Sequence, residues 1–73
     1  MDRLQSMTVF ARVAEVGSFS IAAEHLGLSK STVSKHVTAL EERLGVRLIN
    51  RTTRRLALTE VGAAYRDYCA RIV

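Results

Sequence analysis

Apolar residues recur at the three-and-four spacing of an α-helix from the start of the chain to Leu44. Three amphipathic helices are predicted, over Asp2 to Val16, Ser18 to Leu26 and Ser29 to Leu44. Each begins at an Asp or Ser, whose side chain can accept a hydrogen bond from a free backbone N–H, and each is followed by a glycine that can end a helix. In the third helix the apolar positions advance in steps of four, three and four, at Val33, Val37, Leu40 and Leu44. We therefore expect three helices that pack through these faces around one core.

The periodicity changes to two after the third helix. The first segment has the strand-like residues Val46, Leu48 and Ile49. In the second segment, apolar Leu56 and Leu58 occupy alternate positions. The segment between them is polar and strongly basic and contains Arg51, Thr52, Thr53, Arg54 and Arg55. This pattern predicts a small β-hairpin with a basic tip, which we call the wing. A solvated loop is the alternative, but three arginines with no nearby acid would repel one another there, which favours a phosphate partner for the tip.

A fourth helix is predicted from Thr59, which can cap it, and Glu60 is favourable at the positive end of the helix dipole. Its apolar stripe comprises Val61, Tyr65, Tyr68, Cys69 and Ile72, and it stops at the end of the chain without a cap. The stripe could pack on this domain or on a partner helix. We favour a partner, because the other elements already supply a core. Cys69 is then expected to be a small buried apolar residue and not a nucleophile.

The second and third helices, joined by a tight turn at Gly27, have the layout of a helix-turn-helix. The face of the third helix opposite its apolar stripe is short, polar or basic, with Lys30, Ser31, Thr32, Ser34, Lys35 and Thr38. An ordinary solvated helix face is the alternative. Such a face usually carries Glu–Lys pairs, but no acidic residue occurs between Lys30 and Thr38. Short polar groups let a helix enter a DNA groove and lysine neutralises phosphate, so this asymmetry favours DNA binding.

The charge distribution agrees with a polyanion partner. The 73 residues carry a net charge of +4, and the sequence pI is about 10.0. Residues 29–73 hold nine lysines and arginines against four acidic residues, whereas residues 1–28 hold two against three. A basic side of this kind is typical of nucleic-acid binding, although charge alone is weak evidence because many domains are mildly basic.

Composition limits the remaining classes of protein. The length allows one small domain, and no apolar run is long enough for a membrane span or typical of a signal peptide. A single cysteine excludes an internal disulfide and fits a reducing cytoplasm. His25 and His36 have no cysteine or carboxylate at metal-ligand spacing, and no cofactor or catalytic constellation is expected. A winged-helix module that binds another protein remains the alternative, and the basic face argues against it.

The order of motifs resembles the N-terminal DNA-binding domain of LysR-type transcriptional regulators over essentially the whole chain. The matching stretches are FARVAEVGSFSIAAEHLGLS, then STVSKHVTALEERLGVRL, then NRTTRRLALTEVG. The resemblance implies a mainly α winged helix-turn-helix, with a three-helix core and a small two-stranded wing, in a bacterial cytoplasmic regulator on the nucleoid. Lys30 stands where the family often has Gln; Gln prefers adenine, whereas Lys prefers guanine or phosphate. His36 also stands where the family often has Gln.

The resemblance further divides the chain into a DNA-binding domain and the start of a linker helix. The domain is expected over residues 1–58, with the helix-turn-helix at about 19–38 and the wing at about 48–58, and the truncated linker helix over 59–73. Ser31, Ser34 and Lys35 match family positions that approach bases and phosphates, and Arg54 matches the wing arginine that reaches the minor groove. The resemblance also implies a homodimer through the helix from Thr59, a pseudo-palindromic double-stranded operator, and a small-molecule effector that binds only to a domain absent from this chain.

Overall fold

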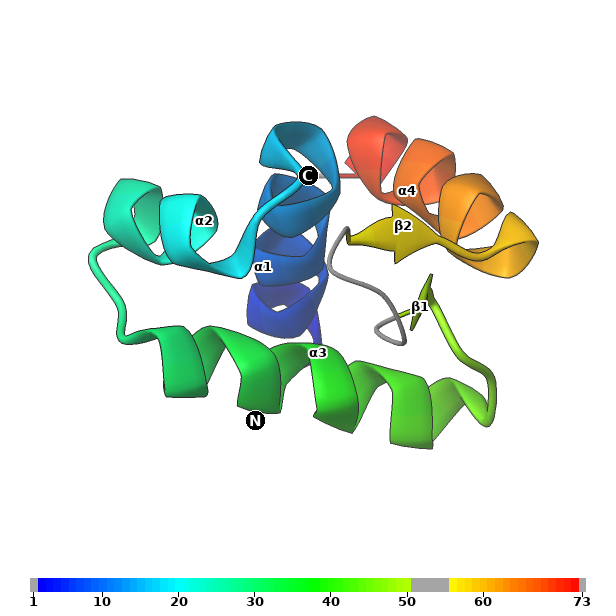
Figure 1. Ribbon diagram of the computed structural model, residues 1–73. Helices are drawn as coiled ribbons and strands as arrows, with labels where there is room; N and C mark the ends of the chain where they lie inside the picture. The colour runs from blue at the N-terminus through cyan, green and yellow to red at the C-terminus, as the bar shows by residue number, and fades with distance from the viewer. Residues whose placement is uncertain (1, 51–55, 73) are drawn as a thin grey trace.

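The computed structural model describes residues 2–50 and 56–72, and its element order follows the predicted one. The helices are α1 (Arg3–Val16), α2 (Phe19–Leu26), α3 (Lys30–Leu44) and α4 (Glu60–Ile72). Two short strands, β1 (Ile49–Asn50) and β2 (Ala57–Leu58), separate α3 from α4. In Figure 1, α1 stands between α2 and α4, and α3 runs crosswise to it. The mainly α fold with a small hairpin is confirmed.

The helix boundaries follow from local capping, as the sequence predicts. Side-chain oxygens of Asp2, Ser18 and Ser29 accept hydrogen bonds from backbone N–H groups at the starts of α1, α2 and α3. Each of these helices ends at a glycine in the left-handed conformation, with φ between 68° and 71°. These termini depend on residues within one helical turn, which is why the sequence alone could place them.

The core lies where α1 meets the other helices and the base of the hairpin. Its fully buried side chains come from α1, α3, the segment around β1, and α4, and include Phe10, Val13, Val33, Val37, Leu40, Leu48, Ile49 and Cys69. Ala22 and Ala23 supply the buried face of α2, and their small side chains allow α2 to approach its neighbours closely. None of the helices within residues 2–50 and 56–72 is long and apolar enough to cross a membrane.

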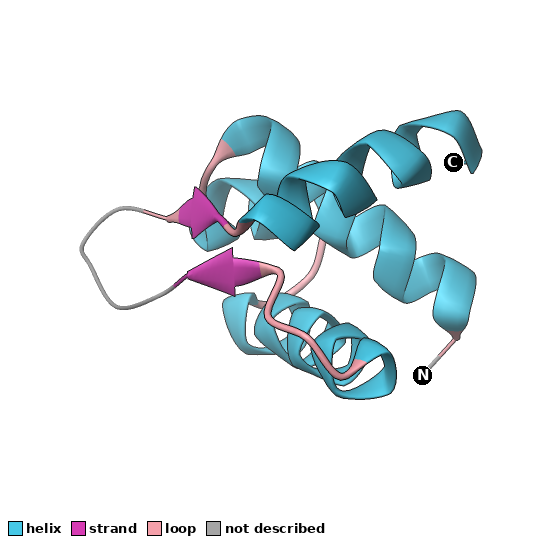
Figure 2. Ribbon diagram, turned by 90° about the vertical axis from the view of Figure 1, so that its right-hand side faces the viewer, coloured by secondary structure: helices cyan, strands magenta, loops and turns pink. Residues whose placement is uncertain are grey.

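The hairpin is antiparallel, with Ile49 opposite Leu58 and Asn50 opposite Ala57. Figure 2 shows the two strands side by side at the edge of the helical body. The first strand is shorter than its strand-like residues indicate. The backbone N–H of Val46 instead donates to the carbonyl oxygen of Glu41 at 3.3 Å and helps to end α3, and Leu48 is buried before the ladder begins.

The apolar stripe of α4 divides between two environments. Cys69 is fully buried in the core, and Tyr65 packs on Phe10 with ring centroids 5.8 Å apart. Val61, Tyr68 and Ile72 remain about half exposed, at 48%, 47% and 49%. The stripe was predicted as one partner-facing surface, but two of its members pack within this domain, and the buried position expected for Cys69 is confirmed.

Candidate nucleic-acid interface

The six predicted contact residues of α3 share one side of the helix. Lys30, Ser31, Lys35 and Thr38 are exposed, and Thr32 and Ser34 are partly buried. The opposite side, with Val33, Val37 and Leu40, is buried against α1 and α2. Among the residues that the structure describes, neither lysine makes an ion pair. The face therefore offers two uncompensated ammonium groups and short hydroxyl side chains.

The first turn of α3 is held by a hydroxyl cluster around Ser29. The Ser29 Oγ atom accepts from the Thr32 backbone N–H at 3.1 Å, and the Ser29 hydroxyl donates to the Thr32 Oγ1 atom at 2.8 Å. The Ser29 and Ser31 Oγ atoms lie 3.2 Å apart. Because the Thr32 oxygen accepts the hydrogen bond from Ser29, the Thr32 hydroxyl proton remains available to a further acceptor. The hydroxyls predicted to face DNA thus also stabilise the start of the helix that carries them.

A buried hydrogen bond supports α3 from behind. The Ser6 Oγ of α1 and the His36 Nδ1 of α3 lie 3.1 Å apart, and both side chains are buried. His36, which has no cysteine or carboxylate at metal-ligand spacing in the sequence, packs in the α1–α3 contact and has a hydrogen-bond partner there. The two residues are 30 positions apart in sequence, so no local pattern could reveal the pair.

Glu41 links α3 to the base of the hairpin, a contact that sequence reasoning missed. An acidic residue in the second half of an amphipathic helix is ordinarily exposed, but the Glu41 side chain is only 7% exposed. Its Oε2 atom accepts from the backbone N–H of Leu48 at 2.8 Å and of Ile49 at 3.2 Å. The available signal was its spacing, because Glu41 lies four residues after Val37, within the apolar stripe of the helix.

The predicted tip of the wing, Arg51, Thr52, Thr53, Arg54 and Arg55, lies outside the described residues. The flanking strands are described, and they bring both ends of this segment together at Asn50 and Ala57, whose side chains are exposed.

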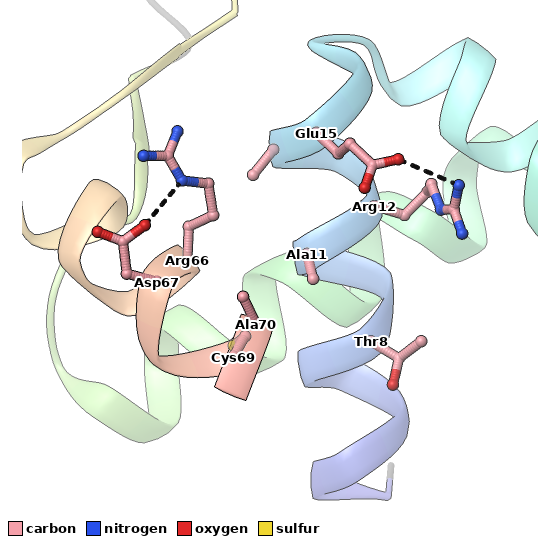
Figure 3. A pocket seen from close by; sticks show the side chains of 9 residues that line it. Thr8, Ala11, Arg12, Glu15, Arg66, Asp67, Cys69 and Ala70 are labelled. Atoms are coloured by element: carbon pink, nitrogen blue, oxygen red, sulfur yellow. Dashed lines mark hydrogen bonds and ion pairs between the residues drawn. The ribbon is translucent and has the colours of Figure 1, made fainter. Parts of the chain in front are cut away.

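A separate pocket of about 510 Å³ lies between α1 and α4 (Figure 3). Two ion pairs border it, Arg12 to Glu15 at 3.3 Å and Arg66 to Asp67 at 3.4 Å. Cys69 also lines the pocket, and burial raises the pKa of its thiol, which keeps it protonated and poorly nucleophilic. Within the described parts of the chain, no three histidine, cysteine or acidic side chains could together hold a metal ion.

Comparison with known proteins identifies relatives of this arrangement. The family model described as "Bacterial regulatory helix-turn-helix protein, lysR family" matches residues 4–63. An HTH-type transcriptional repressor of Pseudomonas aeruginosa strain UCBPP-PA14 is 55% identical over 69 residues, which are 94% of this chain and 22% of that protein. The HTH-type transcriptional activator AaeR of Escherichia coli K12 is 48% identical over the whole chain, which is 24% of its length. The chain thus spans about a quarter or less of these curated relatives.

A solved structure shows the same fold on DNA. The protein in the crystal structure of the BenM_DBD/catB site 1 DNA complex superposes with a TM-score of 0.92 at 30% sequence identity. The match covers 99% of this chain and 79% of that one. The likeness therefore includes the hairpin and α4 as well as the helix-turn-helix.

Proposed function

The chain belongs to the lysR family of bacterial regulatory helix-turn-helix proteins, and we propose that it is the operator-binding part of a longer transcriptional regulator. In this proposal α3 enters the major groove of double-stranded DNA, and the regulator acts in the bacterial cytoplasm on nucleoid DNA. The role is binding and not catalysis. A small-molecule effector would be bound by a part of the regulator outside this chain.

The exposed face of α3 is the observation that carries the proposal. Lys30 and Lys35 have no acidic partner among the described residues. The exposed acid of α3, Glu42, lies in the second half of the helix. A lysine that contacts a phosphate releases a counterion, and this gain makes affinity depend on salt. Short hydroxyls such as Ser31 and Ser34 add little bulk, so the helix axis can approach base edges closely. Charge and shape on this face both favour a duplex groove.

The wing supplies the second proposed contact. No acidic residue occurs between Glu42 and Glu60, while five arginines do, namely Arg43, Arg47, Arg51, Arg54 and Arg55. We assign Arg51, Thr52, Thr53, Arg54 and Arg55 to the DNA backbone and minor groove, where arginine is favoured by the negative potential of a narrow groove. Support comes from the paired strands, which hold both ends of this segment at one edge of the domain.

We propose that α4 joins two copies of the chain. Val61, Tyr68 and Ile72 are apolar or aromatic, about half exposed, and spaced seven and four residues apart on one side of the helix. Tyr65 and Cys69 belong to the same predicted stripe, but they act by supporting it from inside the domain. A two-fold dimer would place its α3 helices in successive major grooves of a pseudo-palindromic site, about 34–36 Å apart.

Selection from a random duplex pool at two salt concentrations tests the proposal. Enrichment of an interrupted palindrome is expected, because a two-fold dimer reads the same half-site twice. A single enriched half-site would refute the dimer but would still support sequence-specific DNA binding. If nothing is enriched and binding disappears at physiological salt, the surface is merely basic, and the protein-interaction alternative replaces the proposal.

The Lys35→Ala variant tests the phosphate role of α3. We expect weaker binding to every duplex in the pool, and a salt dependence of log affinity that is shallower by about one unit of slope. Arg12→Ala is the matched control, because Arg12 is a cation on α1 beside the pocket of Figure 3 and is already paired with Glu15. Equal slopes for Lys35→Ala and the parent chain would contradict the assignment.

A further inference from the structure

The hairpin base is attached to α3 through one buried carboxylate. Glu41 lies on α3, two turns beyond the proposed contact residue Ser34, and its Oε2 atom holds the N–H groups of Leu48 and Ile49 at 2.8 and 3.2 Å. Hydrogen bonds to a charged acceptor are stronger than neutral ones, and buried N–H groups left without an acceptor are costly. The last turns of α3 therefore bind the backbone of Leu48 and of Ile49, the first residue of β1.

The carbonyl groups of Arg47 and Leu48, just before β1, are bound from the opposite side by Thr59, the residue before α4. The Thr59 N–H donates to the Leu48 carbonyl oxygen at 3.0 Å, and the Thr59 hydroxyl donates to the Arg47 carbonyl oxygen at 2.6 Å. Gly62 of α4 packs directly against the Leu48 backbone, where a side chain would collide. The segment before β1 is thus fixed between the two helices, as its position in Figure 1 shows.

The strands themselves cannot set the direction of the wing. Each has two residues, and within residues 2–50 and 56–72 β1 pairs with β2 alone. A hairpin this short is marginal unless it is held by its surroundings. Its orientation relative to α3 therefore depends on the contacts at its base, among which the Glu41 carboxylate is a direct side-chain hydrogen-bonding link from the recognition helix.

We propose that Glu41 is a positioning residue for DNA recognition: it fixes the wing relative to α3, so that major-groove and minor-groove contacts are made in one register. This inference rests on the proposed function, since it assumes that both elements contact the same duplex. Glu41 need not touch DNA in this role. Its carboxylate acts through the two backbone N–H groups that it holds.

Three substitutions separate the parts of this role. Glu41→Leu removes the acceptor, Glu41→Gln keeps an oxygen acceptor without the charge, and Glu41→Asp keeps the charge but is too short to reach both N–H groups without a shift. Glu42→Gln is the matched control, because Glu42 is the next residue in sequence and is exposed. This substitution changes the net charge by the same amount as Glu41→Gln and Glu41→Leu.

Hydroxyl-radical footprinting on the selected operator is the assay, with protection at the α3 positions and at the wing positions each titrated against protein concentration for every variant. Glu41→Leu and Glu41→Asp are expected to weaken protection at the wing positions about tenfold relative to the α3 positions. Glu41→Gln should rescue most of the wing protection, and Glu42→Gln should keep the parent pattern. A purely structural role would reduce both sets of protections together.

The outcomes are distinguishable from failure of the proposed function. If the parent chain selects no duplex, the proposed function itself is wrong. If the parent binds but the Glu41 variants lose all protections in parallel, or lose none, only the positioning role is refuted. If Glu41→Leu does not fold, Glu41→Asp decides, and failure of both variants to fold would mean that Glu41 serves the fold alone.

Discussion

Gly62 offers a prediction in which helix propensity and tertiary packing demand opposite results. It lies in the first turn of α4, and a Cβ atom added there would overlap the Leu48 carbonyl oxygen. The same atom would lie 2.8 Å from the Leu48 carbonyl carbon and 3.2 Å from its Cα. All three neighbours are backbone atoms, so no side-chain rotation can relieve the overlap. In Gly62→Ala either α4 or the hairpin base must move.

The gain in helix propensity and the cost of the steric overlap can be compared in magnitude. Alanine is preferred over glycine in a helix interior by about 1 kcal/mol, which alone would stabilise the variant. Overpacking against a rigid neighbour costs about 1–3 kcal/mol. A shift of α4 also strains the 3.0 Å hydrogen bond from Thr59 to Leu48 and the 2.9 Å bond from the Gly62 N–H to the Thr59 hydroxyl, each contributing about 1 kcal/mol. We expect a net loss of about 2 kcal/mol.

Urea denaturation followed by circular dichroism measures this loss, and the melting temperature should fall by about 8–16 °C for a domain of this size. Ala64→Gly is the matched control, because Ala64 is exposed on the same helix and its change involves propensity alone, for a loss of about 1 kcal/mol. A Gly62→Ala variant as stable as the parent, or more stable, would refute the close approach of α4 to the hairpin.

Two further predictions concern stability. Ser29→Ala removes the oxygen that accepts from the Thr32 N–H at 3.1 Å, so thermal melting should show a loss of about 1 kcal/mol, while Ser29→Asp should keep the cap; equal losses in both would contradict a capping role. Burial raises the pKa of Cys69 above its ordinary value of 9.0, so the folded chain keeps a proton that the unfolded chain has lost above that pH. This contribution is fully present below pH 9.0 and is lost as pH rises through the folded pKa, so the urea midpoint should fall at alkaline pH, and less steeply in Cys69→Ala; parallel curves would exclude Cys69 as a source of the dependence.

Features set by a few neighbouring residues were predictable from the sequence. The caps at Asp2, Ser18 and Ser29 and the hairpin between two apolar alternations follow from local hydrogen bonding and periodicity, and the structure has all of them. The polar side of α3 was also predictable, because burying the opposite stripe determines which residues remain outside. The contact residues named on that side stay predictions until binding is measured.

Features set by distant residues were not predictable. Glu41 reads as a surface acid until β1 is placed beside it, and the small size required at Gly62 depends on where the Leu48 carbonyl lies. The stripe of α4 could not be divided from its spacing either. The burial of Cys69 and the packing of Tyr65 on Phe10 show which members face this domain. In each case the deciding partner comes from another element, which no window along the chain includes.

The attachment of the hairpin base uses mainly main-chain atoms: the N–H groups of Leu48 and Ile49 and the carbonyl oxygens of Arg47 and Leu48. Main-chain groups are the same whatever side chains follow them. The attachment of the hairpin base therefore depends on Glu41, Thr59 and Gly62, and it makes no use of the side chain of Arg47. In the proposed complex with DNA, side chains on the hairpin can then be changed to alter its groove preference while the hairpin base keeps its position relative to α3.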